Sequence, residues 1–520
     1  MKNRKFAYLL LGAAALAGLT ACGASTNKSS NDKNDGNTFK ITTVRWSDWG
    51  EDYHKGFLDD SAKESGIKIK WDTMVAADWS DKKSVLVASG DLPDAFLGSN
   101  AFTDSEIAQN QNMFIPLEDL IKDNMPNLNK AFEKEPKLKA MVTNPDGHIY
   151  SLPKKLPMRP IVGNQLFINK KWLDNLGLKM PETYDELVTV LQAFKDKDAN
   201  GNGDVNDEIP FGSGNFDPTF SYILPFNNRL GGDNTYEMSV KDGKPVYLRT
   251  EESYKQGIAA MHEAYKKGLI DPELFTEDTS MSVAKRMDKG VARVGVSSGW
   301  TADATFGQHA SEYAPLPALK GPDGKQYVIS DPDHLNYGRN EILITNKCKD
   351  PAKLLKWLDK FYTDDASIQN FYGSFGIATE KDGDKYKVLA PKDGKSADEW
   401  AWINSLRDFG PKYVSDDINS HVDIDQTQGD GLKLKMDKEL KQYALPAYPN
   451  VIYSQEELNK LSSIYVDINS YVTQQASKWV VDGGIEEEWD SYLANLKNMG
   501  LDEFIKIQQD AYDRYQKEVK

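Results

Sequence analysis

Residues 39–46 read FKITTVRW and residues 68–75 read KIKWDTMV. Both stretches are short and rich in β-branched and aromatic residues, which is typical of β-strands. DKKSVLVASG (81–90) predicts a helix that ends at Gly90, because glycine commonly follows the last turn of a helix. DAFLGS (94–99) predicts a further strand. Strands and helices that alternate in this way predict an α/β protein, in which ligands bind at the carboxyl ends of the strands.

The same alternation continues along the chain. KLLKWLDKFYT (353–363) and EESYKQGIAAMHEAYKKGLIDPE (251–273) carry apolar residues at helical spacing. No repeat at a fixed period occurs, which argues against a repetitive surface-adhesion protein. A chain of 520 residues that is 39% hydrophobic can bury a large core. Its net charge of −16 argues against nucleic acid as a partner.

The N-terminus predicts export. A basic start is followed by FAYLLLGAAALAGLTA (6–21), an apolar run shorter than the roughly 20 residues of a spanning helix. Leu19-Thr20-Ala21-Cys22 resembles a bacterial lipobox, which implies cleavage before Cys22 and attachment of lipid, palmitate included, to that residue. The alternative is an ordinary signal peptide with an incidental cysteine. Removal of residues 1–21 would delete three basic and no acidic residues and bring the net charge from −16 to −19.

A tether and a disulfide-free body follow. GASTNKSSNDKNDGNT (23–38) is small and polar, so we expect a flexible link between a lipidated Cys22 and the folded part. Cys348 is the one other cysteine, and with Cys22 lipidated no internal disulfide can form. We expect an extracellular monomer anchored to the outer face of the cell membrane.

The run DKDANGNGDVNDEIPF (196–211) is the strongest candidate for a metal site. Oxygen-bearing side chains recur at every second position, and glycines allow the chain to wrap around an ion. Ca²⁺ binds six to eight oxygens, and the run matches part of the EF-hand pattern with Asp196 first and Asp207 twelfth. The alternative is a solvated acidic turn with no ion.

An ordered series of segments carries a specific resemblance. The segments are GDLPDAFLGS (90–99), DGHIYSLP (146–153), residues 166–211, YKKGLIDPELFTED (265–278), ILITNKCKDPAKLLKWLDKFY (342–362) and YGSFGIATE (372–380). Together with the lipobox they resemble the extracellular solute-binding proteins of family 1. These are the lipid-anchored carbohydrate-binding subunits of ABC importers in Gram-positive bacteria.

The resemblance implies a fold and a division of the chain. We expect a two-lobed, periplasmic-binding-protein-like α/β fold of type II, with the lobes joined by a hinge and the ligand cleft between them. Residues 39–158 and 336–390 would form lobe one. Residues 159–335 and 391–520 would form lobe two. The expected partners are a neutral oligosaccharide and the membrane permeases, which would recognise the closed form.

The resemblance also implies a second register for the acidic loop. The family loop reads D-x-N-G-N-G and ends in an acidic pair before I-P. This implies structural Ca²⁺ held by the side chains of Asp198, Asn200 and Asn202, the Asp204 carbonyl, and the acidic pair Asp207 and Glu208. The DEIP ending favours this register over the first.

Sugar-binding residues are expected at strand ends and loops. Aromatic rings cover the apolar faces of sugars, and amides or carboxylates pair with hydroxyls. The aromatic candidates are Trp46, Trp49, Trp79, Trp300, Trp400 and Trp402. The polar candidates are Asp48, Asn100, Asn164 and Gln165. Trp46, Trp300 and Trp402 resemble cleft positions of the family, whereas Trp172 and Trp357 lie on helical stripes and are expected in the core. Core packing is the alternative for each tryptophan.

An enzyme is the main alternative function. GVSSG (295–299) matches the G-x-S-x-G pattern, which would make Ser297 the nucleophile of a hydrolase or esterase. One of His309, His334 and His421 would then have to lie beside it. A glycoside hydrolase would use two carboxylates, but no motif selects a pair among 79 acidic residues. We therefore predict a binding protein that performs no chemistry on its ligand.

Overall fold

The described part of the chain begins after most of the predicted tether. The computed structural model describes residues 36–157, 160–214, 217–227, 236–331 and 336–518. The predicted signal peptide and Cys22 therefore lie outside the described residues. Within those ranges, no helix combines the length and the apolar character that a membrane-spanning segment needs.

The first sheet contains the two stretches quoted at the outset. β1 (Thr38–Arg45) and β2 (Lys68–Val75) pair in parallel, and β3 (Ala95–Leu97) pairs in parallel on the other side of β1. β12 (Ile342–Ile344) comes from much later in the chain and pairs antiparallel with β3. The order is β12-β3-β1-β2. The three predicted strands are confirmed, and a returning segment completes their sheet.

The helix after β2 ends where the sequence predicts but begins earlier. α2 (Ala76–Ser89) is capped by Gly90, whose φ of 68° is the left-handed conformation that glycine adopts without strain. Because α2 starts directly after β2, Trp79 lies in a helix and not in a strand end or loop, which corrects the expectation for that residue. The other helices of this region are α1 (Phe57–Glu64), α3 (Asp104–Gln109), α4 (Glu118–Asn124), α5 (Pro126–Lys134), α6 (Pro136–Ala140), α14 (Pro351–Asp359) and α15 (Asp364–Tyr372).

The second sheet has the order β10-β5-β9-β6. β5 (Gln165–Asn169) pairs antiparallel with both β10 (Tyr313–Pro315) and β9 (Val294–Gly299), and β6 (Ile209–Phe211) pairs in parallel with β9. Its helices are α7 (Lys170–Leu176), α8 (Tyr184–Asp196), α9 (Pro218–Tyr222), α10 (Glu252–Lys266), α11 (Thr279–Arg286) and α12 (Ala302–Phe306). The helix predicted within 251–273 is confirmed as α10.

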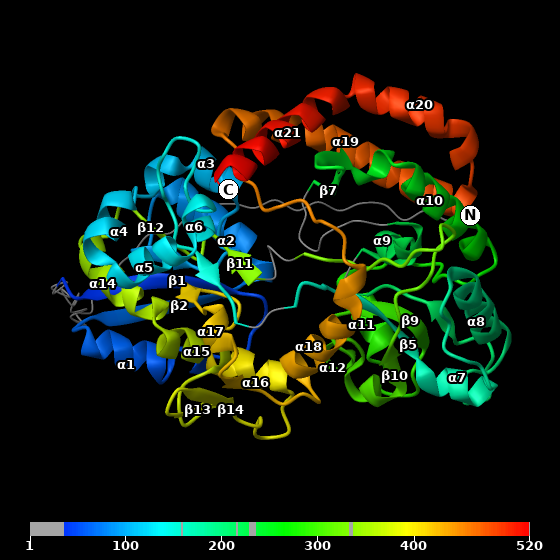
Figure 1. Ribbon diagram of the computed structural model, residues 1–520, viewed down its shortest axis with the longest axis horizontal. Helices are drawn as coiled ribbons and strands as arrows, with labels where there is room; N and C mark the ends of the chain where they lie inside the picture. Colours follow the sequence, from blue (N-terminus) through cyan, green and yellow to red (C-terminus); the bar gives the residue numbers. More distant parts are fainter. Residues whose placement is uncertain (1–35, 158–159, 215–216, 228–235, 332–335, 519–520) are drawn as a thin grey trace, which may run out of the picture. The chain divides into compact units, whose positions relative to one another are not determined.

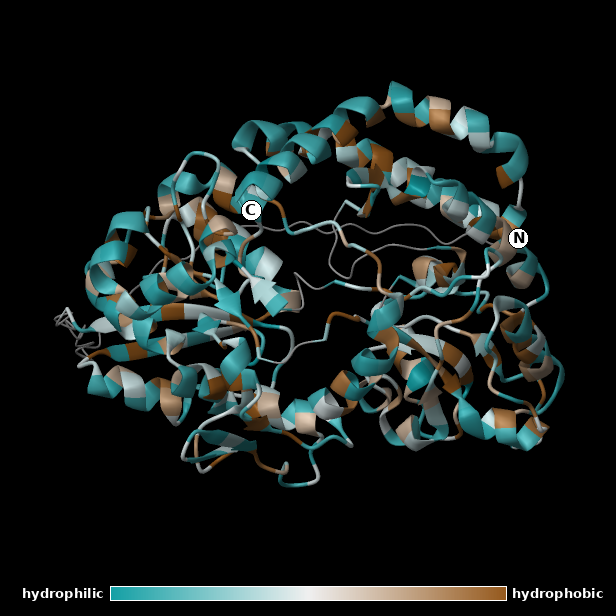
Figure 2. Cartoon of the chain, viewed as in Figure 1, coloured by the Kyte–Doolittle hydropathy of each residue, from teal (hydrophilic) through white to brown (hydrophobic). Residues whose placement is uncertain are grey.

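Three C-terminal helices complete the core around the second sheet. They are α19 (Gln455–Asp482), α20 (Ile485–Asn498) and α21 (Leu501–Glu518), and α19 packs against α10 (Figure 1). Most residues of these helices are hydrophilic, and hydrophobic residues occur among them at intervals (Figure 2). Leu461, Ile468 and Trp479 recur at helical spacing and are buried in the same core as Ile258 of α10. Trp172 belongs to this core and Trp357 to the core of the first sheet, as expected.

A short sheet joins three distant segments. β4 (Lys154–Lys155) lies between β11 (Tyr337–Gly338) and β15 (Lys412–Tyr413). β7 (Met238–Lys241) and β8 (Lys244–Tyr247) form a hairpin, and β13 (Thr379–Asp382), β14 (Lys385–Val388) and β16 (Val422–Asp423) form a small sheet. The last helices are α16 (Ala397–Asn404), α17 (Asp416–Asn419) and α18 (Gly429–Leu440).

One segment of the predicted lobe two contacts elements of the predicted lobe one. α16 contacts α15 and the short helix Asp52–His54, and β15 contacts α15 and β4. α16 also contacts α18, which lies within the predicted lobe two. The division into lobes, with residues 391–520 in lobe two, stays a prediction.

Candidate ligand-binding cavity

A cavity of about 400 Å³ lies where strands of the first sheet end. Trp46 directly follows β1 and Ser99 follows β3, and both line the cavity. Other lining residues come from the start of α3, from β4 and β11, and from the segment before α19. They include Asp104, Lys154, Tyr337, Arg339 and Asn450. A cavity at the carboxyl ends of parallel strands is the position at which α/β proteins bind ligands.

Trp46 presents an open aromatic face to this cavity. Trp46 is 55% exposed, and it is the one tryptophan among the exposed large hydrophobic residues of the described ranges. Its ring lies 5.5 Å from that of Phe409 at an interplanar angle of 46°, so one edge is supported and the face stays open. Because this ring lines the cavity, a sugar bound there would meet a flat apolar surface on which to stack. Trp46 therefore has the geometry of a stacking platform.

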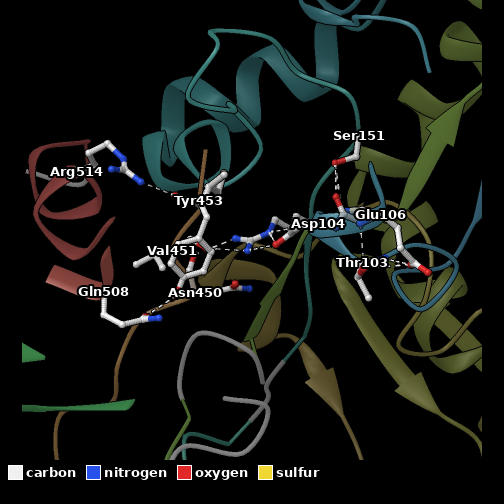
Figure 3. A network of polar contacts seen from close by, with 12 residues as sticks. Thr103, Asp104, Glu106, Ser151, Asn450, Val451, Tyr453, Gln508 and Arg514 are labelled. Atoms are coloured by element: carbon white, nitrogen blue, oxygen red, sulfur yellow. Dashed lines mark hydrogen bonds and ion pairs between the residues drawn. The ribbon is translucent and has the colours of Figure 1, made fainter. Parts of the chain in front are cut away.

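Asp104 and Arg339 form a charged pair, and both residues line the cavity. Figure 3 shows Asp104 in a network of polar contacts that also contains Asn450 and Val451. The Arg339 guanidinium donates through Nε to both carboxylate oxygens of Asp104 at 3.1 Å. It also donates to the carbonyl oxygens of Asn450 at 3.0 Å and Val451 at 2.8 Å. Thr103 caps α3 in a capping box with Glu106, which fixes the backbone that carries Asp104. The wall thus offers fixed donors and acceptors with no net charge.

A buried ionic cluster lies behind the cavity. Lys154 pairs with Glu341 at 2.7 Å and donates to the Asp408 carbonyl oxygen. Lys412, fully buried, donates to the Gly410 carbonyl oxygen at 2.9 Å. Burial lowers the pKa of Lys412 to about 7 and raises the pKa of Glu341. Because Lys154 is already paired, it adds little unbalanced charge to the cavity.

Three predicted tryptophans are brought together beside the cavity. Trp49 stacks on Trp402 with ring centroids 4.5 Å apart and an interplanar angle of 13°. Trp402 in turn lies 5.7 Å from Phe409, the ring that supports Trp46. Arg45 lies over both rings of the stack, and its guanidinium bonds to the Trp402 carbonyl oxygen. Trp402 is only 6% exposed, so in this structure it supports the neighbouring rings.

The other predicted residues are scattered. Trp79 is 3% exposed, and its Nε1 donates to the Ala101 carbonyl oxygen at 2.6 Å, so it packs in the core. Asp48 is exposed and accepts a hydrogen bond from the Gly50 amide. Asn100 has buried amide atoms with no hydrogen-bond partner among the described residues. Trp400 lines a separate cavity.

A further group of predicted residues lies at the second sheet. Asn164 directly precedes β5, and Gln165 begins it. The Gln165 side chain donates to the Asn164 carbonyl oxygen at 2.7 Å. Trp300 directly follows β9, and the Lys433 ammonium lies 4.3 Å above its ring. None of these three lines the cavity beside Trp46.

The sequence argument missed the Asp104–Arg339 pair. The T-x-x-E pattern at Thr103 and Glu106 predicts a helix start, and so points toward Asp104. Nothing local points to Arg339, because 235 positions separate it from Asp104. Only the fold brings the two side chains together.

The acidic loop is ordered by its own side chains. The Asp198 carboxylate accepts hydrogen bonds from the backbone amides of Gly201, Asn202 and Gly203 at 2.7–3.0 Å. The Asp207 carboxylate accepts from the side-chain amides of Asn200 at 2.9 Å and Asn202 at 2.7 Å. Four of the predicted ligands therefore converge in one turn of chain.

The donor set fits a hard cation. The side-chain NH₂ groups of Asn200 and Asn202 now face Asp207. Rotation of each side-chain amide by 180° would turn its oxygen toward Asp207 instead, where the two oxygens and the carboxylate would bind a cation. Glu208 is buried, burial raises its pKa, and its Oε2 has no partner among the described residues. Asp204 is exposed, and its carboxylate accepts a hydrogen bond from the backbone amide of Asn206 at 3.0 Å. Within the described ranges no three His, Cys, Asp or Glu side chains are arranged around one metal position. A cation here would therefore depend on amide and backbone oxygens as well.

Ser297 does not have the position of a nucleophile. GVSSG lies within β9, where Ser297 pairs with Phe167, and not in a turn between strand and helix. Its side chain is 0% exposed and donates to the Ser213 carbonyl oxygen at 2.6 Å. The two glycines have a packing role, since a Cβ at Gly295 would come within 2.6 Å of Phe194.

No histidine neighbour activates this serine in the described structure. The His309 side chain bonds to the Asp288 carbonyl oxygen at 2.8 Å, and His421 is exposed. His334 lies outside the described residues. The cavity thus has groups suited to stacking and hydrogen bonding, and Ser297, the serine that matched a catalytic pattern, is buried inside a sheet. These features are typical of a protein that binds a solute.

Comparison with known proteins agrees with this class. The chain belongs to the bacterial extracellular solute-binding protein family, whose model matches residues 46–368. It is 33% identical to the fructooligosaccharide ABC transporter substrate-binding protein FusA of Streptococcus pneumoniae, over 99% of each chain. It is 26% identical to Lipoprotein LipO of Bacillus subtilis, over 71% of this chain and 73% of LipO.

Solved structures show the same fold. FusA in complex with kestose has a TM-score of 0.79 and covers 92% of this chain and 99% of its own, and an EF-hand mutant of FusA has been solved with fructo-nystose. An HMO-binding solute-binding protein of Bifidobacterium longum infantis is 28% identical with a TM-score of 0.78, covering 92% and 99% of the two chains. The expected two-lobed fold is confirmed, and the protein is a solute-binding component of an ABC importer and not an enzyme.

Proposed function

We propose that this protein binds a neutral oligosaccharide in the cavity beside Trp46 and delivers it to the permeases of its ABC importer. The observation that carries the proposal is the open Trp46 ring next to the Asp104–Arg339 pair. FusA, whose name specifies fructooligosaccharides, is related over almost the whole chain, and its solved structure contains kestose. These relatives support a short oligosaccharide as the ligand class.

The cavity has the groups that an uncharged sugar requires. The Trp46 ring would cover the C–H face of one sugar ring. Asp104 would accept hydrogen bonds from hydroxyls, while Arg339 and the amide of Asn450 would donate to them. Because the charged side chains are paired, a neutral ligand meets no unbalanced charge and a polyanionic glycan gains nothing. The expected neutral oligosaccharide therefore suits this wall.

Delivery would follow closure of the two lobes around the sugar. Asn164, Gln165 and Trp300 lie at the ends of β5 and β9 in the second sheet, where a closing lobe would bring them to the ligand. A ligand favours the closed state by the contacts it makes only there. The test is calorimetric titration with kestose and other neutral oligosaccharides. Binding without sugar release supports the proposal, and release of smaller sugars overturns it.

Calcium would stabilise the loop after α8. We assign the ligands Asp198, Asn200, Asn202, Asp204, Asp207 and Glu208, as the second register implies. The hydrogen bonds from Gly201, Asn202 and Gly203 to Asp198 favour this register, since the first carboxylate of such a loop turns inward. Asp196 instead accepts from Gln192 of α8, outside the turn. The EF-hand mutant of FusA supports a metal loop in a relative.

Cys22 would anchor the protein to the membrane surface through lipid, with residues 23–38 as the tether. LipO, a relative over most of this chain, is named a lipoprotein. Replacing Cys22 with serine is expected to release most of the protein into the culture medium, because no lipid can then be attached. The apolar run 6–21 does not replace the lipid, since it is shorter than the roughly 20 residues of a spanning helix. Immunoblots of cell and medium fractions measure this. Retention of Cys22→Ser on the cell to the same degree as the unmodified protein would contradict the anchor.

Ser297→Ala is expected to leave sugar affinity within about twofold of the unmodified protein. The hydroxyl bonds to the Ser213 backbone inside a sheet and does not line the cavity. Loss of that bond is expected to lower unfolding stability by about 1 kcal/mol. Calorimetric titration and thermal unfolding distinguish these effects. Loss of the protein's function in Ser297→Ala with an unchanged melting temperature would favour an esterase.

A further inference from the structure

The described chain enters the fold where the parallel strands of the first sheet begin. The Lys68 amide donates to the Asn37 carbonyl oxygen at 2.8 Å, and the Lys353 ammonium donates to the Asn37 side chain. β1, β2 and β3 run in the same direction, so all three begin at this edge of the sheet. β12 runs the opposite way and ends there, shortly before α14 begins. Segments from distant parts of the chain therefore meet at one end of the sheet.

This end of the sheet has an excess of lysine. We call it the basic pole and define it by the segments 36–40, 63–70, 90–94 and 345–356. It contains eight lysines and four carboxylate residues, whereas the whole chain has 63 basic and 79 acidic residues, so its charge is opposite to that of the protein. The lysines are Lys40, Lys63, Lys68, Lys70, Lys347, Lys349, Lys353 and Lys356, and all of them except Lys353 are exposed. The carboxylate residues are Glu64, Asp91, Asp94 and Asp350.

The carboxylates of the basic pole are mostly engaged by groups other than its ammonium groups. Asp94 accepts a hydrogen bond from the backbone amide of Lys40 at 2.7 Å. Asp350 caps α14 by accepting from the backbone amide of Lys353 at 3.0 Å. Glu64 lies 3.7 Å from the ammonium of Lys360, which is outside the pole. The lysines therefore give this surface a net positive charge.

Salt decides which charges a partner of this surface would sense. At physiological ionic strength the screening length is about 8 Å, so the acidic residues on other faces contribute little at the basic pole. The lysines come from several segments and do not surround one point. An extended anionic surface can approach many of them at once, whereas a single small anion cannot. The pattern therefore fits a surface and not a small ligand.

The predicted lipid places such a surface close to the basic pole. On the proposed function Cys22 is lipidated, and the intervening residues 23–37 span at most about 50 Å when fully extended. The chain enters the fold at Asn37, within the pole itself. The end of the sheet that has the positive charge is thus the end joined to the membrane. Acidic phospholipids give a membrane a negative surface that attracts lysines.

We propose that the basic pole lies against acidic phospholipid headgroups of the membrane to which the protein is anchored. This proposal rests on the proposed anchor at Cys22. Trp46 follows the other end of β1, and the eight residues of that strand span roughly 26 Å. Contact at the pole therefore leaves the Trp46 cavity open to sugar. The contact is electrostatic and weak, so it orients the anchored protein and does not replace the lipid.

The test measures binding of lipid-free protein to vesicles. The chain from residue 22 with Cys22→Ser is sedimented with vesicles of phosphatidylcholine alone and with vesicles that contain about one third phosphatidylglycerol. We expect binding to the acidic vesicles only, and loss of most of it when salt is raised from about 50 mM to about 300 mM. Equal binding to both kinds of vesicle, or binding to neither, would overturn the proposal. A preference for soluble polyphosphate over acidic vesicles would also overturn it, since the partner would then be a free polyanion.

Two charge-matched variants distinguish the basic pole from the rest of the surface. One replaces three exposed lysines of the pole with glutamate: Lys68→Glu, Lys349→Glu and Lys356→Glu. The other makes the same change at exposed lysines of α10, its C-cap and α20: Lys266→Glu, Lys267→Glu and Lys497→Glu. The pole variant should bind acidic vesicles at least about fivefold more weakly, and the control should stay within about twofold of the parent chain. Equal weakening in both variants would overturn the assignment to the pole.

Sugar titration and thermal unfolding of both variants complete the test. The substituted lysines are exposed and do not line the Trp46 cavity, so sugar affinity and melting temperature should stay close to those of the parent chain. Because the vesicle assay uses no lipid anchor, its outcome is independent of the fractionation experiment on Cys22→Ser. A failure of the anchor and a failure of the basic pole are therefore seen separately.

Discussion

Trp46→Ala is expected to weaken oligosaccharide binding about 30- to 100-fold, or ~2–3 kcal/mol. The ring is more than half exposed, and a bound sugar would bury the rest of its apolar face. Its loss also leaves Phe409 as the nearest aromatic surface, and that ring is buried and angled away. Calorimetric titration with kestose, or with the best neutral ligand found, measures the change.

The stability of the same variant provides the control. Because Trp46 is largely solvent-exposed, its removal should change the free energy of unfolding by no more than about 1 kcal/mol. Trp46→Phe keeps a ring at the same position and should recover much of the affinity. Trp79→Ala is the contrasting variant, since its ring is buried and its loss should cost about 3–5 kcal/mol of stability. An affinity unchanged in Trp46→Ala would place the sugar elsewhere.

Calcium is expected to raise the melting temperature by about 5–10 °C. An extracellular site of this kind has a dissociation constant of about 10⁻⁴ M, so a hundredfold excess of calcium stabilises by ~2.7 kcal/mol. For a lobe of some 200 residues this corresponds to about 2–4 °C per kcal/mol. The gain should vanish in Asp207→Asn, because the carboxylate at the centre of the turn loses its charge. Thermal unfolding with calcium, with magnesium and with a chelator measures this.

Asp196→Asn is the matched control and also separates the two registers. Asp196 is exposed and pairs with Gln192, but it would be the first ligand in the alternative register. We expect Asp196→Asn to keep the full calcium response. Loss of the response in this variant would favour the alternative register. If calcium does not change the melting temperature of the unmodified protein, the proposal of a calcium site is wrong.

Local pattern predicted the secondary structure around the cavity well. The β-branched runs predicted β1 and β2. The helical spacing around Trp172 and Trp357 predicted that both side chains are buried in the core. Trp79 was misplaced because the boundary between β2 and α2 leaves no loop, and propensity alone does not locate such a junction. GVSSG matched a catalytic pattern, yet its glycines serve close packing inside a sheet.

The sequence by itself determined the alternation of strands and helices, the candidate calcium turn and the class of solute-binding protein. These follow from residues close together in the chain, or from the order of segments along it. The tertiary structure alone decided which tryptophan stays open, which ones stack behind it, and that Arg339 meets Asp104 across 235 positions. Burial and pairing depend on which distant segments share a core, and hydrophobic packing fixes that only when the whole chain has folded.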